Sequence, residues 1–342
     1  MGIVFNLTMT FFLSKKIILL AGLVFLAAMP VHNAEDPLSE IFEIGTVQSI
    51  VIQKNGDMVT ELYSGSMNGN RNVNIKSASK SVLSLLIGIA IDKGYIESVH
   101  QTIDEFFPEY FEENPDPDKA SITIQDLLTM RSGLETTSFR NYGRWVLSNN
   151  WVRFALNQPM TDRPGGNMIY STGTSHLLSV ILTRASGIST REFGNRYLFR
   201  PMGISIGGWD RDPQGYYMGG NNMAMNPHDL IKIGQLMMDV GQYNGEQLVS
   251  REWILESVDI YTRSNFNPYN YGYMWWRKSV EDYEVFFAWG NGGQYILILP
   301  ELESVISITS NLNNNSGSRR YQREIFRFLG DTIIPFLEND KE

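Results

Sequence analysis

The sequence predicts an α+β protein: one antiparallel sheet built from both ends of the chain, with flanking helices and an inserted helical subdomain. Strand periodicity appears twice, after residue 40 and again in about the last eighty residues, and mostly helical patterns lie between. We therefore expect one domain over 35–342, with the sheet part at about 40–100 and 265–342 and the helical subdomain at about 101–264. A chain of 342 residues that is 43% hydrophobic can bury a sizeable core.

The first segment, 1–34, is typical of an export signal. Lys15 and Lys16 precede an apolar run, 17–28, and the small residue Ala34 offers a cleavage site. The run is shorter than the roughly 20 residues that a membrane span needs. We expect an exported protein, periplasmic or extracellular. An uncleaved N-terminal anchor is the alternative, and it is the only membrane attachment that we expect.

A β-hairpin is expected next. Two runs rich in strand-forming residues, 47–53 and 58–63, flank Asn55 and Gly56, and Asn-Gly between such runs favours a tight turn. A helix that is apolar on nearly all sides then follows Ser77, and such a helix lies at the centre of a domain.

The remaining elements follow from periodicity and from capping and turn residues. Helices are expected at 122–128, 174–185, 227–241, 251–257 and 319–337. Strands of an antiparallel meander are expected at 271–276, 284–288, 294–299 and 305–310.

Composition excludes several classes of function. The sequence has no cysteine, which rules out disulfides, thiol catalysis and cysteine-based zinc sites. Its four histidines form no His-x-x-x-His pair, and the net charge of −9 argues against a nucleic-acid partner. We expect no metal, no organic cofactor and no nucleic acid; the sequence does not indicate an oligomeric state.

Ser77 and Lys80 are the candidate catalytic pair. Three residues apart at the start of a helix, they lie on one face, about one turn from each other. The helix N-terminus stabilises an anion there, and a partly desolvated lysine can lose its proton near neutral pH and act as a base. The alternative is an N-capping serine with an exposed lysine.

This pair belongs to a motif at 77–81, and further motifs follow it in order at 127–134, 164–165 with 170–171, 199–203, 290–294 and 309–311. With these motifs the chain resembles the serine β-lactamase-like hydrolases. That family includes class C β-lactamases, DD-peptidases, esterases and aminohexanoate-oligomer hydrolases. The resemblance covers nearly all of the chain after the N-terminal segment.

The resemblance implies roles for individual residues. Ser77 would form an acyl-enzyme, Lys80 would be the principal base, and Tyr170 would shuttle a proton beside them. Tyr170 could instead be an aromatic residue packed in a turn. Thr172 is a candidate substrate-binding residue. It occupies a position where the β-lactam-active members mostly have Asn, and a hydroxyl cannot replace an amide that donates and accepts at once.

The third family motif, Lys-Thr-Gly or a relative of it, aligns with residues 288–290. This alignment makes the backbone N–H of Asn291 the second oxyanion donor, beside that of Ser77; a shift of two residues would make it that of Gly293. Gly290, Gly292 and Trp289 belong to the same candidate substrate-binding stretch. A Gly-rich bend between edge strands is the structural alternative.

The motif's cationic residue is missing here, which leaves a cleft that offers packing in place of charge. We therefore expect a serine hydrolase of small ester or amide substrates with an apolar acyl part, and little β-lactamase activity. The alternatives are a β-lactamase or DD-peptidase acting on peptidoglycan-like substrates, and a catalytically silent binding or sensor protein on the same fold. A Ser-His-Asp hydrolase is disfavoured because the chain has no Gly-x-Ser-x-Gly elbow.

Overall fold

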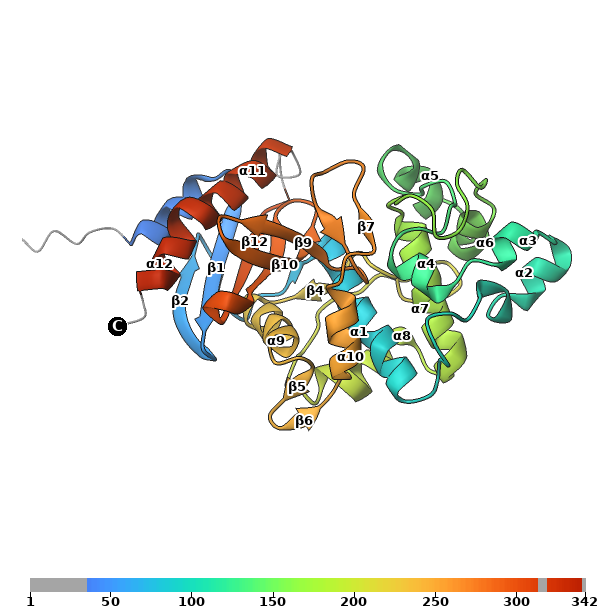
Figure 1. Cartoon of the computed structure of the whole chain (residues 1–342), viewed down its shortest axis with the longest axis horizontal. Coiled ribbons are helices and arrows are strands. Elements are labelled where there is room, and N and C mark those ends of the chain that lie inside the picture. The colour runs from blue at the N-terminus through green and yellow to red at the C-terminus, as the bar shows by residue number, and fades with distance from the viewer. Residues whose placement is uncertain (1–35, 313–318, 340–342) are drawn as a thin grey trace, which may run out of the picture. The chain divides into compact units, whose positions relative to one another are not determined.

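The structure is a computed structural model that describes residues 36–312 and 319–339; the expected export signal, 1–34, lies outside them. An eight-stranded antiparallel sheet has the order β2-β1-β12-β11-β10-β9-β8-β7 (Figure 1). Strands from the two ends of the chain lie side by side at β1 and β12, which confirms the predicted sheet. The strands are β1 (Val47–Lys54), β2 (Asp57–Tyr63), β3 (Val73–Asn74), β4 (Ala224–Met225), β5 (Gln242–Tyr243), β6 (Glu246–Gln247), β7 (Thr262–Arg263), β8 (Asn270–Tyr271), β9 (Trp276–Val280), β10 (Tyr283–Gly290), β11 (Gln294–Leu299) and β12 (Ser304–Ser310).

Helices flank this sheet and form most of the region between β3 and β7. The α-helices are α1 (Ser79–Asp92), α2 (Pro108–Glu113), α3 (Pro117–Ala120), α4 (Ile124–Leu128), α5 (Tyr142–Val146), α6 (Trp151–Leu156), α7 (Thr172–Ser186), α8 (Thr190–Gly194), α9 (Pro227–Met238), α10 (Arg251–Ser257), α11 (Arg319–Phe328) and α12 (Ile334–Asn339). The 3₁₀ turns are η1 (Pro37–Glu43), η2 (Lys76–Ala78), η3 (Ile103–Glu105), η4 (Phe139–Asn141) and η6 (Pro300–Leu302), and the π turns are η5 (Asn195–Phe199) and η7 (Leu329–Ile333).

The two faces of the sheet are covered by different helices. A Cβ added at Gly234 of α9 would collide with Val305 of β12, so α9 packs directly on that face. On the opposite face, the ring of Phe326 in α11 lies 5.2 Å from that of Phe287. Helix α9 lies inside the range expected for the helical subdomain, yet it contacts β1, β11 and β12.

Helix α1 is the buried centre that its apolar pattern predicted. Every residue from Ser79 to Ala90 is buried. Gly88 lets α1 approach α10, because a Cβ there would collide with the indole ring of Trp253. The helix ends before Gly94, whose φ of +71° is a left-handed conformation that favours glycine.

Helix α7 packs against α1, α4 and α6. Ser171 caps its start by accepting a hydrogen bond from the backbone N–H of Thr174 (3.4 Å), and Gly187 ends it at a φ of +72°. The helix therefore begins two residues earlier than the sequence predicts. This start places Thr172 in the first turn, within hydrogen-bond distance of Lys80.

The strand predicted at 271–276 is wrong. β8 ends at Tyr271 and β9 begins at Trp276, and between them Met274 takes a left-handed φ of +63°. The Met274 carbonyl accepts a hydrogen bond from the Ser81 hydroxyl of α1 (2.6 Å), and its N–H donates to the Leu128 carbonyl (3.2 Å). These contacts with two helices replace the hydrogen bonds of a strand. Local periodicity in the sequence does not reveal such long-range contacts. The helix predicted at 319–337 is present, with η7 inserted between α11 and α12.

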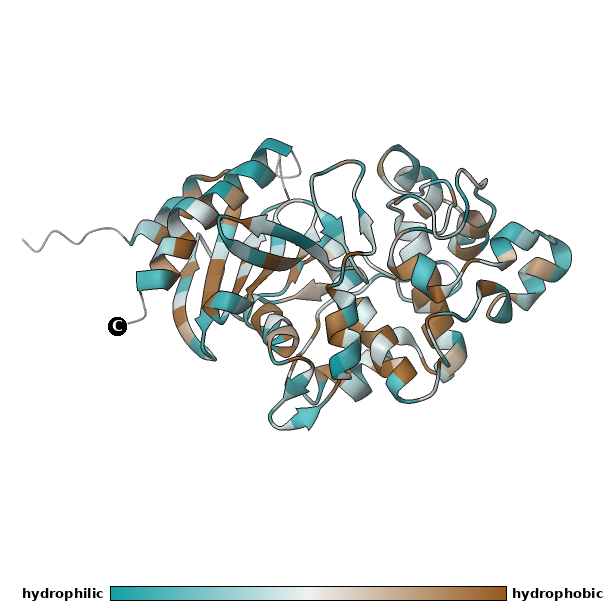
Figure 2. Cartoon of the chain, viewed as in Figure 1, coloured by the Kyte–Doolittle hydropathy of each residue, from teal (hydrophilic) through white to brown (hydrophobic). Residues whose placement is uncertain are grey.

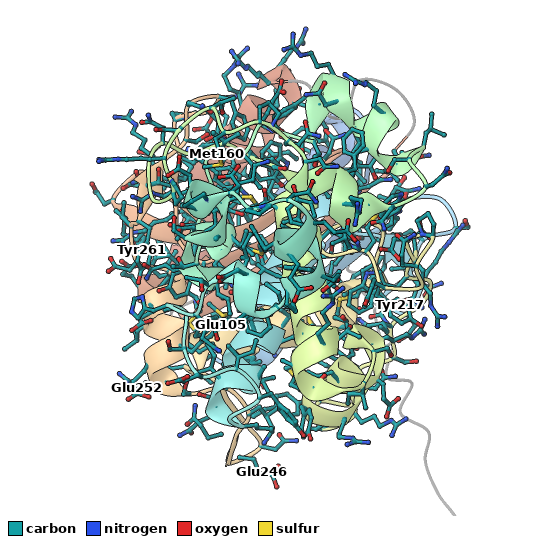
Figure 3. The ribbon with its side chains drawn as sticks, turned by 90° about the vertical axis from the view of Figure 1, so that its right-hand side faces the viewer. Glu105, Met160, Tyr217, Glu246, Glu252 and Tyr261 are labelled. Atoms are coloured by element: carbon teal, nitrogen blue, oxygen red, sulfur yellow. The ribbon has the colours of Figure 1, made fainter. Side chains whose placement is uncertain are left out.

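Hydropathy follows this architecture. Figure 2 shows hydrophobic residues concentrated on α1 and α7 and along the sheet strands. Viewed from the helical side, Glu246 of β6 and Glu252 of α10 point outward (Figure 3), and both are exposed. Within 36–312 and 319–339, no helix combines the length and the apolar character that crossing a bilayer requires.

Candidate active site

Ser77 lies in a tight turn immediately before α1. Its neighbour Lys76 has a left-handed φ of +52°, held by a hydrogen bond from the Lys76 N–H to Asn74 Oδ1 (2.9 Å) and another from the Ser79 hydroxyl to the Lys76 carbonyl (2.7 Å). The N-cap of α1 is Ala78, so Ser77 is not the capping serine of the alternative interpretation. Its hydroxyl is directed toward a cavity and toward Lys80.

The Lys80 amine is buried beside that hydroxyl. Lys80 Nζ lies 3.3 Å from Ser77 Oγ, 3.3 Å from Thr172 Oγ1 and 2.6 Å from the Gly220 carbonyl oxygen. The side chain is 1% exposed, and this burial lowers the pKa of Lys80 to about 7. An amine with that pKa is substantially neutral at physiological pH and can accept a proton.

Tyr170 completes the group, in the segment that leads into α7. Its ring centroid lies 5.0 Å from Lys80 Nζ, and Tyr170 lines the same cavity as Ser77. Burial raises the pKa of Tyr170 to about 12, and the nearby Ser77 side chain opposes this rise. The structure thus brings together the three side chains that the sequence singled out as candidate catalytic residues.

Thr172 is placed differently from the sequence expectation of a substrate contact. It borders the cavity, but it is only 3% exposed and its hydroxyl is hydrogen-bonded within the protein. The partners are Lys80 Nζ and the hydroxyl of Ser138, which lies 3.0 Å away. Thr172 therefore helps to hold the lysine, and its hydroxyl is engaged before any substrate arrives.

A buried histidine holds the backbone segment that contacts Lys80, and the sequence analysis did not identify this role. His176 and Asp212 are both buried, with Nε2 3.0 Å from Oδ2, while the Gly219 N–H donates to His176 Nδ1 (3.2 Å). The next residue, Gly220, has a φ of +82°, and a Cβ there would collide with Lys80. The adjacent glycines in the sequence were the available signal for a close backbone approach.

A cavity of about 480 Å³ opens over Ser77. Aromatic side chains form much of its wall, but a cation is also present: Lys76 lines the same cavity. The expectation that this cleft offers packing in place of charge is therefore incomplete. The lining residues are Lys76, Ser77, Ser138, Phe139, Tyr142, Tyr170, Thr172, Asn221, Asn222, Phe266, Trp289 and Asn291.

The stretch aligned with the third family motif reaches this cavity at the end of β10. Gly290 lies so close to the Ile75 carbonyl that a Cβ would collide with it, which brings the end of β10 against η2. Trp289 and Asn291 line the cavity, whereas Gly292 and Gly293 do not. The N–H of Gly293 donates to the carbonyl of Gly290 (3.2 Å).

Fold and site together define a class: serine hydrolases that pair a nucleophilic serine with a lysine one helical turn away, beside an antiparallel sheet. The family model described as Beta-lactamase matches residues 45–327, and the chain belongs to the beta-lactamase family. The resemblance seen in the sequence motifs is confirmed, and so is the prediction that the chain is an enzyme.

Three relatives illustrate the range of this similarity. A 6-aminohexanoate-dimer hydrolase from Paenarthrobacter ureafaciens is 23% identical over 298 residues, which cover 79% of this chain and 74% of that protein. A solved Bacillus anthracis protein, provisionally named a 6-aminohexanoate-dimer hydrolase, has a TM-score of 0.74 at 19% identity over 88% of this chain and 82% of that one. A family VIII carboxylesterase has a TM-score of 0.69 at 13% identity over 85% of this chain and 94% of that one. The two structural similarities establish the shared fold.

Proposed function

We propose that the protein hydrolyses small ester or amide substrates through an acyl-enzyme on Ser77, with Lys80 as the principal base. The observation that carries this proposal is the buried Lys80 amine, with a pKa of about 7, placed 3.3 Å from the Ser77 hydroxyl at the edge of a substrate-sized cavity. The similarity to proteins named as a 6-aminohexanoate-dimer hydrolase and a family VIII carboxylesterase supports the substrate class.

The reaction takes two steps. Ser77 Oγ attacks the substrate carbonyl carbon while its proton passes to Lys80 Nζ, and the tetrahedral intermediate then collapses and releases the alcohol or amine, which receives a proton through Tyr170. In the second step water attacks the acyl-enzyme and Lys80 takes the water proton. The ester bond to Ser77 breaks, Ser77 regains its proton, and the acid leaves.

The pKa values of Lys80 and Tyr170 determine which of the two side chains acts as the base. Near pH 7 about half of the Lys80 amines are neutral, whereas a phenol with a pKa of about 12 is ionised in only about one molecule in 10⁵. Lys80 is therefore the base. Tyr170 serves as a neutral donor and acceptor between the Ser77 oxygen and the leaving alcohol or amine.

The oxyanion would be held by the backbone N–H groups of Ser77 and Asn291. Asn291 lines the cavity together with Ser77, which supports this register of the third motif. Gly293, the other candidate, already donates its N–H to the Gly290 carbonyl and lies outside the cavity lining. The aromatic wall that includes Phe266 and Trp289 suits an apolar acyl group.

A covalent label tests this proposal. A fluorophosphonate probe should modify the wild-type protein on Ser77, and Ser77→Ala should abolish both labelling and turnover of p-nitrophenyl butyrate. Ser84→Ala is the matched control, because Ser84 is a buried serine of α1, the helix that follows Ser77, and its hydroxyl has no hydrogen-bond partner within the described residues. Labelling that survives in Ser77→Ala would refute the assignment of the nucleophile.

We also propose export, which rests on the composition of residues 1–34 alone. Expression of the full chain in a bacterial host, followed by osmotic shock and N-terminal sequencing, would test it. Recovery of the intact N-terminus in the cytoplasmic fraction would refute export.

A further inference from the structure

The cavity over Ser77 holds a charge that the proposed mechanism does not use. Of the side chains that line it within the described residues, Lys76 alone belongs to a residue type that is charged at neutral pH. Lys76 directly precedes the nucleophile, so its Cα lies about 3.8 Å from that of Ser77. Lys76 and Ser77 line the same cavity.

This ammonium group is held in place without being neutralised by contact. Its one described hydrogen bond runs from Lys76 Nζ to Asn222 Oδ1 (3.3 Å), and within the described residues no carboxylate lies within ion-pair distance of Nζ. The nearby carboxylate, Asp210, instead accepts a hydrogen bond from the other end of the same amide, Asn222 Nδ2 (2.8 Å). The amide thus separates the opposite charges, and the ammonium retains two N–H groups that can reach a ligand.

Surrounding contacts fix this arrangement. Asn222 Oδ1 also accepts from Asn74 Nδ2 (3.1 Å), which determines that the amide oxygen faces Lys76. Lys76 and Asn222 both have left-handed backbones, with φ of +52° and +55°. Such conformations cost free energy in residues other than glycine, and they persist only where the surrounding structure holds them. Burial lowers the pKa of Lys76, while the charge of Asp210 opposes this change.

A second donor lines the same cavity. The Tyr142 hydroxyl accepts a hydrogen bond from Asn221 Nδ2 (2.9 Å), which leaves its own proton available. Burial raises the pKa of Tyr142, so the phenol remains protonated and can donate. A half-buried cation and a neutral donor that share a cavity suit a carboxylate better than an apolar group.

We propose that Lys76 is a specificity-determining residue that binds an anionic group of the substrate, so that the preferred substrates are esters or amides bearing a carboxylate a few bonds from the scissile carbonyl. This inference rests on the proposed acyl-enzyme function and names its substrate class. The aromatic wall would pack against the chain between the scissile carbonyl and the carboxylate.

Matched substrates test this inference. Mono-p-nitrophenyl adipate and its methyl ester differ only in the charge of the distal group. We expect wild-type kcat/KM to be higher for the anion, and we expect Lys76→Met to lower the ratio of the two kcat/KM values by about 10-fold to 100-fold, the range of a charge-assisted hydrogen bond. Lys76→Arg should restore part of that ratio. Lys278→Met is the control, because Lys278 is also a half-buried lysine but lies over Phe326, outside the cavity lining.

A binding measurement accompanies the kinetics. Adipate should slow fluorophosphonate labelling of Ser77 more than dimethyl adipate does, and Lys76→Met should remove this difference. A ratio that Lys76→Met leaves unchanged, or that Lys278→Met lowers instead, would overturn the inference. Ser77-dependent hydrolysis would still support the proposed function in that case. If Ser77→Ala keeps full turnover, or if wild type shows neither labelling nor turnover, the proposed function fails and this inference fails with it.

Discussion

Replacing Lys80 by Met should produce an inactive protein. Its free energy of unfolding should lack the contribution that rises with pH as Lys80 titrates. In the folded protein burial holds the pKa of Lys80 at about 7, against 10.5 in an ordinary environment. Between these two values the unfolded chain keeps a proton on Lys80 that the folded protein has released. The free energy of unfolding of the wild type therefore rises with pH across this window, whereas Met does not titrate.

The magnitude follows from the size of the shift. A depression of about 3.5 pKa units corresponds to a cost of about 5 kcal/mol for burying the charged amine well below pH 7. At pH 9 about 2 kcal/mol of this cost remains. The free energy of unfolding of wild type relative to Lys80→Met should thus increase by about 3 kcal/mol from pH 6 to pH 9. The Gly220 carbonyl loses its donor in the variant, which costs about 1–3 kcal/mol at every pH and leaves the difference between the two pH values unaffected.

Urea unfolding of both proteins at pH 6, 7, 8 and 9 measures this difference, and p-nitrophenyl butyrate turnover is followed in parallel. In the wild type kcat/KM should rise with an apparent pKa near 7, because the neutral amine is the base. A wild-type minus variant difference that stays constant over this range, within the error of linear extrapolation, would refute the depressed pKa. Substantial turnover by Lys80→Met would refute its role as the base.

Two variants, with a control, and one substrate comparison also probe the site. Tyr170→Phe should lower kcat roughly 10²–10⁴-fold, measured with p-nitrophenyl butyrate, because the phenol proton no longer reaches the leaving group. Gly220→Ala should abolish activity because its Cβ would displace Lys80, whereas Gly215→Ala, also at a left-handed φ with no atom in the way, should cost only about 1–2 kcal/mol of stability; equal activity in the two variants would contradict this. Nitrocefin should show a lower kcat/KM than p-nitrophenyl butyrate, because the Thr172 hydroxyl is already hydrogen-bonded to Lys80 and Ser138; a higher value would reverse the proposed preference.

The residues that sequence could identify are those whose chemistry is local. Ser77 and Lys80 are one helical turn apart, so their proximity follows from the helix itself. The hairpin between β1 and β2 follows from Asn55 and Gly56, which both take the left-handed backbone that a tight turn requires. Tyr170 was identified through the order of family motifs, since nothing in its neighbourhood in sequence brings it to Ser77.

What sequence could not identify depends on contacts between distant segments. The Gly220 carbonyl lies 2.6 Å from Lys80 Nζ although 140 residues separate them, and no periodicity encodes that approach. In the sequence, Lys76 resembles an ordinary polar residue of a loop. The direction of its side chain depends on a left-handed backbone conformation, which the sequence does not predict. The break between β8 and β9 was missed for a similar reason: Met274 contacts two helices that lie far from it in the chain.

The position of β1 in the sheet has a consequence for the order of folding. β1 lies between β2 and β12, and the hydroxyls of Ser49 and Thr309, 260 residues apart, are 2.6 Å from each other. The hairpin of β1 and β2 can form early, but two strands alone are at best marginally stable in water. β1 pairs with β12 only after the long chain between them has closed into a loop. This requirement slows folding and leaves one edge of β1 unpaired until then. We therefore expect refolding to be slow and prone to aggregation at high protein concentration, with the register between β1 and β12 among the last contacts to form.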